Sequence, residues 1–281
     1  MACKKCVKKD KAWQTIRDEA VQMSSDEPML ASFFHSTIIN HDSLGAALSF
    51  QLANKLGSVT MPPIVLREVI EQALSADPAI LDAVACDICA VTERDPAVTY
   101  LSTPLLYLKG FQALQAYRIA HWLWLQARQS LALFLQHQIS VVYGVDIHPA
   151  AQIGYGIMLD HATGIVIGET AVIGNDVSIL QNVTLGGTGK EHGDRHPKIR
   201  EGVMIGAGAK VLGNIEVGEG AKIGAGSVVL APVPPHTTVA GVPAKEVGRP
   251  STLKPSLSME QDIRTGLMPR FFHCHSYMTS S

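Results

Sequence analysis

The chain has 281 residues, with 23 basic and 25 acidic side chains and a formal net charge of −2. Its residues are 47% hydrophobic and 17% charged, which provides a sizeable core and excludes an intrinsically disordered chain. The balanced charge argues against a nucleic-acid partner, because such proteins usually carry a basic surplus. Of the 24 glycines, 19 lie within 151–250, where Tyr155 is the only aromatic residue. We therefore expect two differently built domains.

The sequence predicts neither a secretory signal nor a membrane span. The N-terminal residues are basic, and no apolar segment follows them, so we expect no secretory signal. The most apolar region, 105–145, is interrupted by Lys109, Arg118 and Arg128 and is too broken to span a membrane. Five cysteines are too few for a disulfide scaffold. These features predict a cytoplasmic protein with no membrane partner.

Two cysteine pairs have the spacing of zinc ligands: Cys3 with Cys6, and Cys86 with Cys89. The second pair lies in segment 81–91, which is typical of a helix with small buried residues. The first pair lies at a terminus, where chains are usually poorly ordered. We interpret the four thiols as buried or inert and predict no metal site, with a four-thiolate zinc site as the less favoured alternative.

The first 142 residues are predicted to be helical. Residues 13–23 form a short amphipathic pattern, and cap-type residues and prolines mark later helix starts at Pro28, Ser43, Pro63 and Pro78. The helix after Pro78 is expected to end near Arg94. A long apolar pattern then runs from 105 to 134, with a face wide enough for burial against more than one neighbour, including another subunit.

From Ile147 the apolar period changes to six residues, which neither a helix nor an alternating strand produces. Six-residue repeats are the signature of a parallel β-helix, whose tight corners favour glycine. Thirteen positions fit the repeat: Ile147, Ile153, Leu159, Ile165, Ala171, Val177, Val183, Ile199, Ile205, Val211, Val217, Ile223 and Val229. We predict an α + β chain, with an N-terminal α-helical domain (1–142), a left-handed parallel β-helix (143–245) with one extruded loop, and a flexible tail (246–281).

The six-residue repeat breaks once. Val183 and Ile199 are 16 residues apart, two repeats plus four residues, so a loop must leave the coil between them. This loop, 184–198, is rich in glycine, charge and histidine. Insertions in repeat proteins often carry the function. We therefore expect functional residues in this loop.

Several segments resemble the serine acetyltransferase family of hexapeptide-repeat acyltransferases, over about residues 10–250. The similar segments are Val145–Ala151, Met158–Gly164, Asp194–Lys198, Glu27–Ser32, Arg94–Ala97 and Ser102–Gly110. The resemblance implies transfer of acetyl from acetyl-CoA, a co-substrate, to the hydroxyl of L-serine, the first step of cysteine synthesis. It implies no bound cofactor.

Acetyl transfer to a weakly acidic hydroxyl needs a base. A neutral imidazole, with an ordinary pKa of about 6.5, suits this role, and general-base help is worth about 10²–10⁴-fold. The resemblance implies His161 as the base and Asp146, 15 residues earlier, as the carboxylate that orients its ring from an adjacent coil. Without the resemblance, His161 is better read as a structural residue at a coil corner.

A zwitterionic acceptor needs both signs of charge around it. The resemblance assigns Asp95 and Asp160 to the ammonium group, Arg195 to the carboxylate and His196 to a further hydrogen bond. Taken alone, Asp95 would be read as a helix terminator and Arg195 as a solvated loop charge.

The same resemblance implies that acetyl-CoA lies in the groove between neighbouring solenoids of a trimer. Small residues and one lysine would line it: Gly187, Thr188, Ala207, Lys222 and Ala225. Lys222 would contact the phosphate or adenine end, with a solvated lysine equally open, and a backbone N–H near Gly187 would stabilise the thioester oxyanion. The family also implies hexamers formed by two trimers, and feedback inhibition by L-cysteine.

Three other functions stay open from the residues alone. They are a hexapeptide acetyltransferase for a sugar or antibiotic, a zinc hydro-lyase of the γ-carbonic anhydrase kind using His192 and His196, and a non-enzymatic scaffold. The first usually lacks the helical domain, and the last leaves the charged loop unexplained. One departure from the family concerns the end of the chain: it finishes at Ser281, without the C-terminal isoleucine by which many members bind O-acetylserine sulfhydrylase, which argues against that complex.

Overall fold

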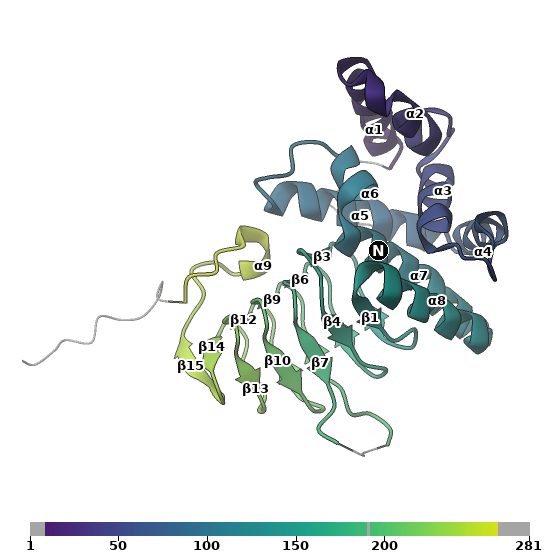
Figure 1. Cartoon of the computed structure of the whole chain (residues 1–281). Coiled ribbons are helices and arrows are strands. Elements are labelled where there is room, and N and C mark those ends of the chain that lie inside the picture. Colours follow the sequence, from purple (N-terminus) through teal and green to yellow (C-terminus); the bar gives the residue numbers. More distant parts are fainter. Residues whose placement is uncertain (1–8, 190–191, 264–281) are drawn as a thin grey trace, which may run out of the picture.

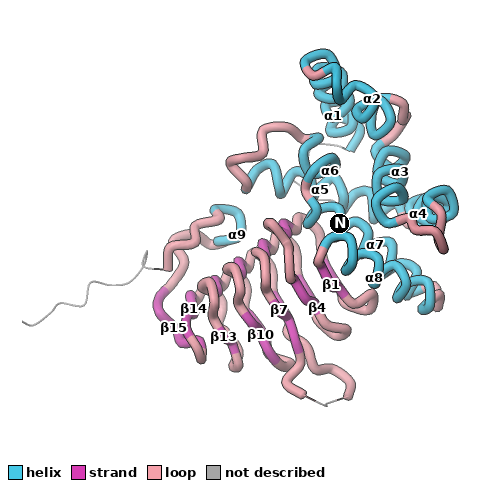
Figure 2. The backbone as a smooth tube through the Cα atoms, in the orientation of Figure 1, coloured by secondary structure: helices cyan, strands magenta, loops and turns pink. Residues whose placement is uncertain are grey.

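The structure, a computed structural model, describes residues 9–189 and 192–263. A helical region occupies the N-terminal half and a solenoid of short strands the rest (Figures 1 and 2). Cys3 and Cys6 lie outside the described residues, and Cys86 and Cys89 are both buried in a helix. In the described part of the chain, no helix is long and apolar enough to cross a membrane.

The helical region contains ten helical segments among the described residues, several of which begin at the predicted caps. Ser43 accepts a hydrogen bond from the backbone N–H of Ala46, and Asp77 accepts one from that of Ala79. The segments are α1 (Lys9–Asp26), η1 (Pro28–Leu30), α2 (Ala31–Phe34), η2 (His35–Ile39), α3 (Leu44–Leu56), α4 (Pro63–Ala76), α5 (Pro78–Arg94), α6 (Ser102–Tyr107), α7 (Lys109–Leu125) and α8 (Gln129–Tyr143).

The long apolar pattern after Pro104 is divided into three helices. Leu108 has an extended backbone (ψ 107°) between α6 and α7, and Ala127 adopts a left-handed conformation (φ +57°) between α7 and α8. Helix α7 is buried on nearly all sides over its first three turns, because α4, α5, α6 and α8 as well as the first strands of the solenoid pack against it. Its wide apolar face is thus covered by more than one neighbour within the chain.

The parallel β-helix is confirmed. Each coil contributes one strand to each of three parallel sheets, in the orders β1-β4-β7-β10-β13, β2-β5-β8-β11 and β3-β6-β9-β12-β14. The strands are β1 (Val145–Ile147), β2 (Gln152–Ile153), β3 (Met158–Leu159), β4 (Ile165–Ile167), β5 (Val172–Ile173), β6 (Ser178–Ile179), β7 (Thr184–Gly186), β8 (Lys198–Ile199), β9 (Met204–Ile205), β10 (Lys210–Leu212), β11 (Glu216–Val217), β12 (Lys222–Ile223), β13 (Val228–Val229) and β14 (Thr238–Gly241).

One corner of the solenoid is longer than the corners stacked on it. From Leu159 to Val166 the chain takes seven steps, whereas their ladder partners in the next coil, Ile179 and Thr184, are five steps apart. The six-residue repeat does not reveal the two extra residues. Ile165 continues the repeat in the sequence, whereas Ile167, two residues later, is the aliphatic residue that stacks on Ile147. This longer corner contains Asp160 and His161.

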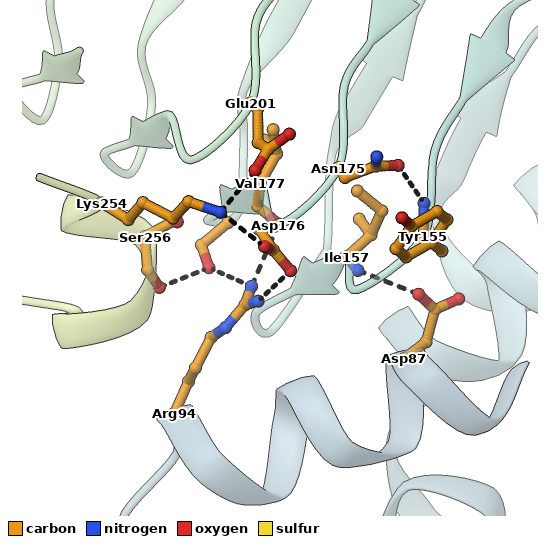
Figure 3. A network of polar contacts seen from close by, with 11 residues as sticks. Asp87, Arg94, Tyr155, Ile157, Asn175, Asp176, Val177, Glu201, Lys254 and Ser256 are labelled. Carbon is orange, nitrogen blue, oxygen red and sulfur yellow. Dashed lines mark hydrogen bonds and ion pairs between the residues drawn. The ribbon is translucent and has the colours of Figure 1, made fainter. Parts of the chain in front are cut away.

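Helices α7 and α8 pack on β1 and close that end of the solenoid, as an open repeat array requires, while α5 lies along the first two coils. The fully buried Asp87 accepts hydrogen bonds from Arg118 (2.7 Å) and from the backbone N–H of Ile157 (2.9 Å). Two turns later, Arg94 donates to Ser178 Oγ (3.0 Å) and pairs with Asp176 (3.5 Å) (Figure 3). Arg118 also donates to the backbone carbonyl of Gly154 (2.7 Å), so these arginines and Asp87 bond the helical region to the solenoid.

The segment after residue 245 was expected to be flexible; in the structure its described part contains a strand and a short helix that pack on the rest of the chain. Strand β15 (Ala244–Gly248) pairs antiparallel with β14, and the short helix α9 (Pro255–Ser258) returns to α5. Lys254 forms ion pairs with Asp176 (2.9 Å) and Glu201 (Figure 3). The segment packs on the solenoid because Lys254 pairs with two of its carboxylates. Residues 264–281 lie outside the described residues.

Candidate functional site

The corner that carries His161 has an unusual backbone. His161 (φ +53°) and Ala162 (φ +63°) both adopt the left-handed conformation, which is uncommon for residues other than glycine. Ala162 is buried, while the side chain of His161 is 74% exposed. The backbone thus turns the imidazole out of the solenoid.

A cavity of about 310 Å³ lies beside this corner, between the helical region and the first coil. Its polar lining includes Asp95 at the end of α5, Lys109 at the start of α7, and Asp160 with His161 on the corner. The apolar lining comes from residues such as Phe111 and Met158 of the two domains. Three of the predicted site residues, Asp95, Asp160 and His161, therefore meet at one cavity.

The electrostatics of this cavity are dominated by its two carboxyl groups. Burial and the nearby charge of Asp95 raise the pKa of Asp160, while His161 opposes the shift. His161 Nε2 lies 3.8 Å from Asp160 Oδ1, which is beyond hydrogen-bond distance. A cation bound between the two carboxylates would relieve their repulsion.

The His161 corner continues down one edge of the solenoid. The left-handed Gly164 (φ +75°) ends this corner, and its conformation recurs at Asn182 (φ +59°), Gly208 (φ +73°) and Gly226 (φ +68°). Backbone hydrogen bonds connect these turns coil by coil. The position before each turn is occupied on successive coils by Thr163, Gln181, Ala207 and Ala225, and His161 lies two residues before Thr163 on the longer corner. We name this row, together with His161, the His161 edge.

A second cluster lies at the C-terminal ends of the strands in the sheet that begins at β1, whereas the His161 corner lies at their N-terminal ends. The extruded loop leaves the solenoid after β7 and rejoins it at this cluster (Figure 1). Arg195 donates to Glu169 Oε2 (2.6 Å), and this bond lowers the pKa of Glu169. His196 is buried on Gly168, and Thr170 binds both loop residues. Gly187 lies close to the backbone of Arg195, and Thr188 lies beyond it. We name this cluster the Arg195 edge.

The two edges are separated within one chain. The flat strand between the corners advances about 3.3 Å per residue, so its five steps span roughly 17 Å. Among the described residues, no hydrogen bond or ion pair joins the His161 edge to the Arg195 edge. A molecule as small as an amino acid cannot contact both edges of the same chain.

Asp146 does not contact His161, although they were expected to meet on adjacent coils. Asp146 stands in the middle of β1, opposite Val166, which follows His161 by five residues. It accepts a hydrogen bond from Gln136 (2.7 Å), and its charge acts on His148. The register of the first two coils, rather than the sequence separation, determines that Asp146 lies beside Val166 and away from His161.

Lys222 is 3% exposed, and its ammonium group donates to the backbone carbonyl of Asp262 (2.8 Å). Burial lowers its pKa, while Glu260 and Asp262 oppose the shift. Ile263 lies over the neighbouring Gly224. In this arrangement the C-terminal segment covers the lysine that the sequence suggested for the phosphate or adenine end.

Sequence reasoning missed several residues around the two edges. Glu169 and Thr170 appear in the sequence as an ordinary turn, and only the folded chain brings them to Arg195 and His196. Gln181 stands one coil from His161, and its side-chain oxygen is buried with no hydrogen-bond partner among the described residues. Its place could have been found from the repeat, since it occupies the same corner position as Ala207.

The chain is similar to known proteins over both the helical region and the solenoid. The family model described as "Serine acetyltransferase, N-terminal" matches residues 12–116, and the model "Bacterial transferase hexapeptide (six repeats)" matches 196–231. The curated serine acetyltransferase of Escherichia coli K12 is 69% identical over 256 residues, covering 91% of this chain and 94% of the relative. The crystal structure of serine acetyltransferase from Vibrio cholerae is 71% identical, with a TM-score of 0.89, covering 90% and 98% of the two chains.

Two similar solved structures carry ligands. A serine acetyltransferase in complex with cysteine is 67% identical (TM-score 0.88), covering 90% of this chain and 98% of its own. One in complex with CoA is 68% identical (TM-score 0.82), covering 84% and 99%. Both the helical region and the solenoid are included in these matches. The chain is thus an acyltransferase that belongs to the serine acetyltransferase family.

Proposed function

We propose that this protein transfers the acetyl group of acetyl-CoA to the hydroxyl of L-serine, releasing O-acetyl-L-serine and CoA. One observation carries the proposal: a cavity holds two carboxyl groups, Asp95 and Asp160, next to an exposed imidazole, His161. The carboxylates suit an ammonium group, and the imidazole suits a hydroxyl that must lose a proton. Membership in the family agrees with this acceptor.

The carboxylate of serine needs a cation. Lys109 of the cavity wall donates to Thr163 Oγ1, and the cation that we assign to the carboxylate is Arg195, on the Arg195 edge. Because the two edges of one chain are far apart, we propose that the site is completed by a second copy. In a ring of three chains, the Arg195 edge of one chain faces the His161 edge of the next in a repeated head-to-tail contact. Arg195 then forms two hydrogen bonds to the carboxylate, and His196 donates another.

The same arrangement gives Asp146 a role. It lies in β1 two residues before His148, whose pKa responds to Asp146 as well as to Glu169 and Arg195 of the Arg195 edge. A neighbouring chain would bring its Asp146 toward the imidazole of His161. There the carboxylate accepts a hydrogen bond from one ring nitrogen and leaves the other free to act as a base.

The transfer then proceeds directly between the two bound substrates. His161 takes the proton of the serine hydroxyl as the oxygen attacks the thioester carbonyl and the C–O bond forms. A backbone N–H near Gly187 stabilises the oxyanion of the tetrahedral intermediate. The C–S bond breaks, and His161 returns the proton to the departing thiolate of CoA.

Acetyl-CoA is proposed to lie along the His161 edge. Ala207 and Ala225 continue the row below His161, and their small side chains leave room for the pantetheine arm. Gly187 and Thr188 of the neighbouring chain form the opposite wall. Lys222 reaches the phosphate or adenine end only when the segment over it moves aside, because Asp262 holds its ammonium group here.

L-Cysteine is proposed as a feedback inhibitor of the same site. It differs from serine only by sulfur in place of oxygen, so it presents the same ammonium and carboxylate to Asp95, Asp160 and Arg195. A related enzyme was solved with cysteine bound. We also propose that trimers pair into hexamers through the helical domains.

A thiol-release assay with acetyl-CoA tests the proposal. L-Serine, D-serine, ethanolamine, sugars and amines are offered as acceptors to the full-length protein. We expect CoA release with L-serine that exceeds release with each of the others by at least about 100-fold, because the other molecules lack one charged group or present it in the wrong place. Release with a sugar and none with L-serine would overturn the proposal.

A further inference from the structure

A pair of adjacent residues, Glu169 and Thr170, holds the two loop residues of the Arg195 edge in place. Glu169 binds the guanidinium group of Arg195, as described above. Thr170 Oγ1 accepts hydrogen bonds from the backbone N–H groups of Arg195 (3.0 Å) and His196 (3.1 Å). Lys198 adds a bond to the carbonyl of Thr170 (2.8 Å). The corner between β4 and β5 thus binds the extruded loop where it rejoins the solenoid.

The hydrogen bonds around His196 determine which of its ring nitrogens carries the proton. The backbone N–H of Thr170 donates to His196 Nδ1 (3.2 Å), so this nitrogen carries no proton. Thr170 Oγ1 lies 2.8 Å from the same nitrogen. Both oxygen lone pairs already accept the two loop N–H groups, so its single hydrogen is left for Nδ1 and for the carboxylate of Asp194, with which Thr170 also forms a side-chain hydrogen bond. Neutral His196 therefore carries its proton on Nε2 and is a hydrogen-bond donor there.

The ring also has little freedom to move. His196 packs directly on Gly168, where a Cβ atom would lie 2.0 Å from Nε2. The charged and titratable groups around the ring are Arg195, Glu169, Lys198 and His148. Burial and the charge of Arg195 lower the pKa of His196, which keeps the ring neutral.

We propose that Thr170 is a positioning residue for substrate recognition: its hydroxyl orients the Arg195–His196 pair and holds His196 with Nε2–H as the donor for the acceptor's carboxylate. Gly168 assists by giving the ring its seat. This inference rests on the proposed function and adds two residues to its carboxylate site. Neither touches the substrate; both act through His196.

Steady-state kinetics of three variants of the full-length enzyme test the inference. Thr170→Val keeps the shape and removes the hydroxyl, Thr170→Ser keeps the hydroxyl, and Gly168→Ala displaces the ring without touching Thr170. We expect Thr170→Val to raise the KM for L-serine about 10- to 50-fold, the usual effect of losing hydrogen bonds around a charged ligand. The kcat should stay within about 3-fold and the KM for acetyl-CoA within about 2-fold.

The other two variants separate positioning from general damage. Thr170→Ser should remain within about 3-fold of wild type in the KM for L-serine, and Gly168→Ala should raise that KM at least about 5-fold. Equal impairment of Thr170→Ser and Thr170→Val would overturn the inference, as would a KM for L-serine that Thr170→Val leaves unchanged. So would parallel changes in kcat and in the KM for acetyl-CoA.

Folding and the proposed function are checked independently. Thermal unfolding identifies a variant that fails to fold; if Thr170→Val fails, the inference stands or falls on Gly168→Ala, which displaces the ring but keeps the Thr170 hydroxyl and its bonds to the two loop N–H groups. The proposed function is tested by the wild-type enzyme alone. A wild type that acetylates L-serine, with a Thr170→Val variant that binds it equally well, would remove only the positioning role.

Discussion

The two edges of the solenoid treat their histidines in opposite ways. His161 is largely exposed, and within the described residues its ring makes no hydrogen bond, only a distant contact with Asp160. His196 is 7% exposed, and its Nδ1 receives two donors from Thr170. A base must gain and lose a proton in every turnover, whereas an anchor must present the same donor each time. The contrast shows how one side-chain type is given either duty by its surroundings.

The largest effect should come from deleting the base. His161→Ala is expected to lower kcat by about 10²–10⁴-fold, since general-base help contributes that much. Its thermal unfolding should match wild type, because the imidazole is exposed and packs against little. Rate measurements with saturating L-serine check this, and a loss below about 10-fold would assign His161 to the surface.

Combining two defective chains tests whether the edges meet between copies. His161→Ala and Arg195→Ala variants, co-expressed, place an intact His161 edge against an intact Arg195 edge at about one quarter of the contacts in randomly mixed trimers. Activity at low L-serine should then recover to about a quarter of wild type, far above either parent. Purified tagged hetero-oligomers provide the measurement, and recovery no better than the sum of the parents would place the whole site in one chain.

Replacing the proposed carboxylate anchor should affect binding more than turnover. Arg195→Ala is expected to raise the KM for L-serine about 10- to 100-fold through loss of a charge-assisted pair. The KM for acetyl-CoA should change less than about 2-fold. Arg195→Lys is the matched control, since it keeps the charge but not the planar fork. Its KM for L-serine should lie between those of wild type and Arg195→Ala. An unchanged KM for L-serine would remove Arg195 from this role.

The pH dependence of serine binding sharpens the picture of the His161 edge. The raised pKa of Asp160 means that its charge is present at neutral pH and is lost, as the pH falls, earlier than for a carboxyl with the ordinary value of about 3.9. The Kd for L-serine should therefore begin to rise, as the pH falls, at a higher pH than a carboxyl with the ordinary pKa would give. Calorimetry on the His161→Ala variant removes the imidazole from the comparison, and a flat profile down to pH 4.5 would contradict the assignment of Asp160.

The smallest effect is expected at the covered lysine. Lys222→Met preserves the packing of the side chain and removes a charge that Asp262 already holds. With the segment in place, the KM for acetyl-CoA should change by less than about 2-fold. A rise of about 5-fold or more, measured beside the Lys222→Arg control, would mean that the segment moves and the lysine reaches the phosphates.

Much of the architecture could be predicted from the sequence, and the failures have physical causes. The six-residue repeat predicted the β-helix because each coil must place an aliphatic residue at the same inward positions. The continuous pattern after Pro104 could not reveal its breaks, because Leu108 and Ala127 are good helix formers whose backbone conformations depend on packing. The ordering of the segment around Lys254 depends on carboxylates more than fifty residues away.

The candidate site divides in the same way. The sequence by itself determined the two domains, the single extruded loop and, through the resemblance, the residues gathered on each edge, since these follow from local periodicity and short motifs. Only the tertiary structure decided which residues meet. The packing of α5 on the first coils brought Asp95 to Asp160 and His161. The register of the coils separated these residues from Asp146 and Arg195 and brought Thr170 to His196, because contacts between distant segments are set by how the elements stack.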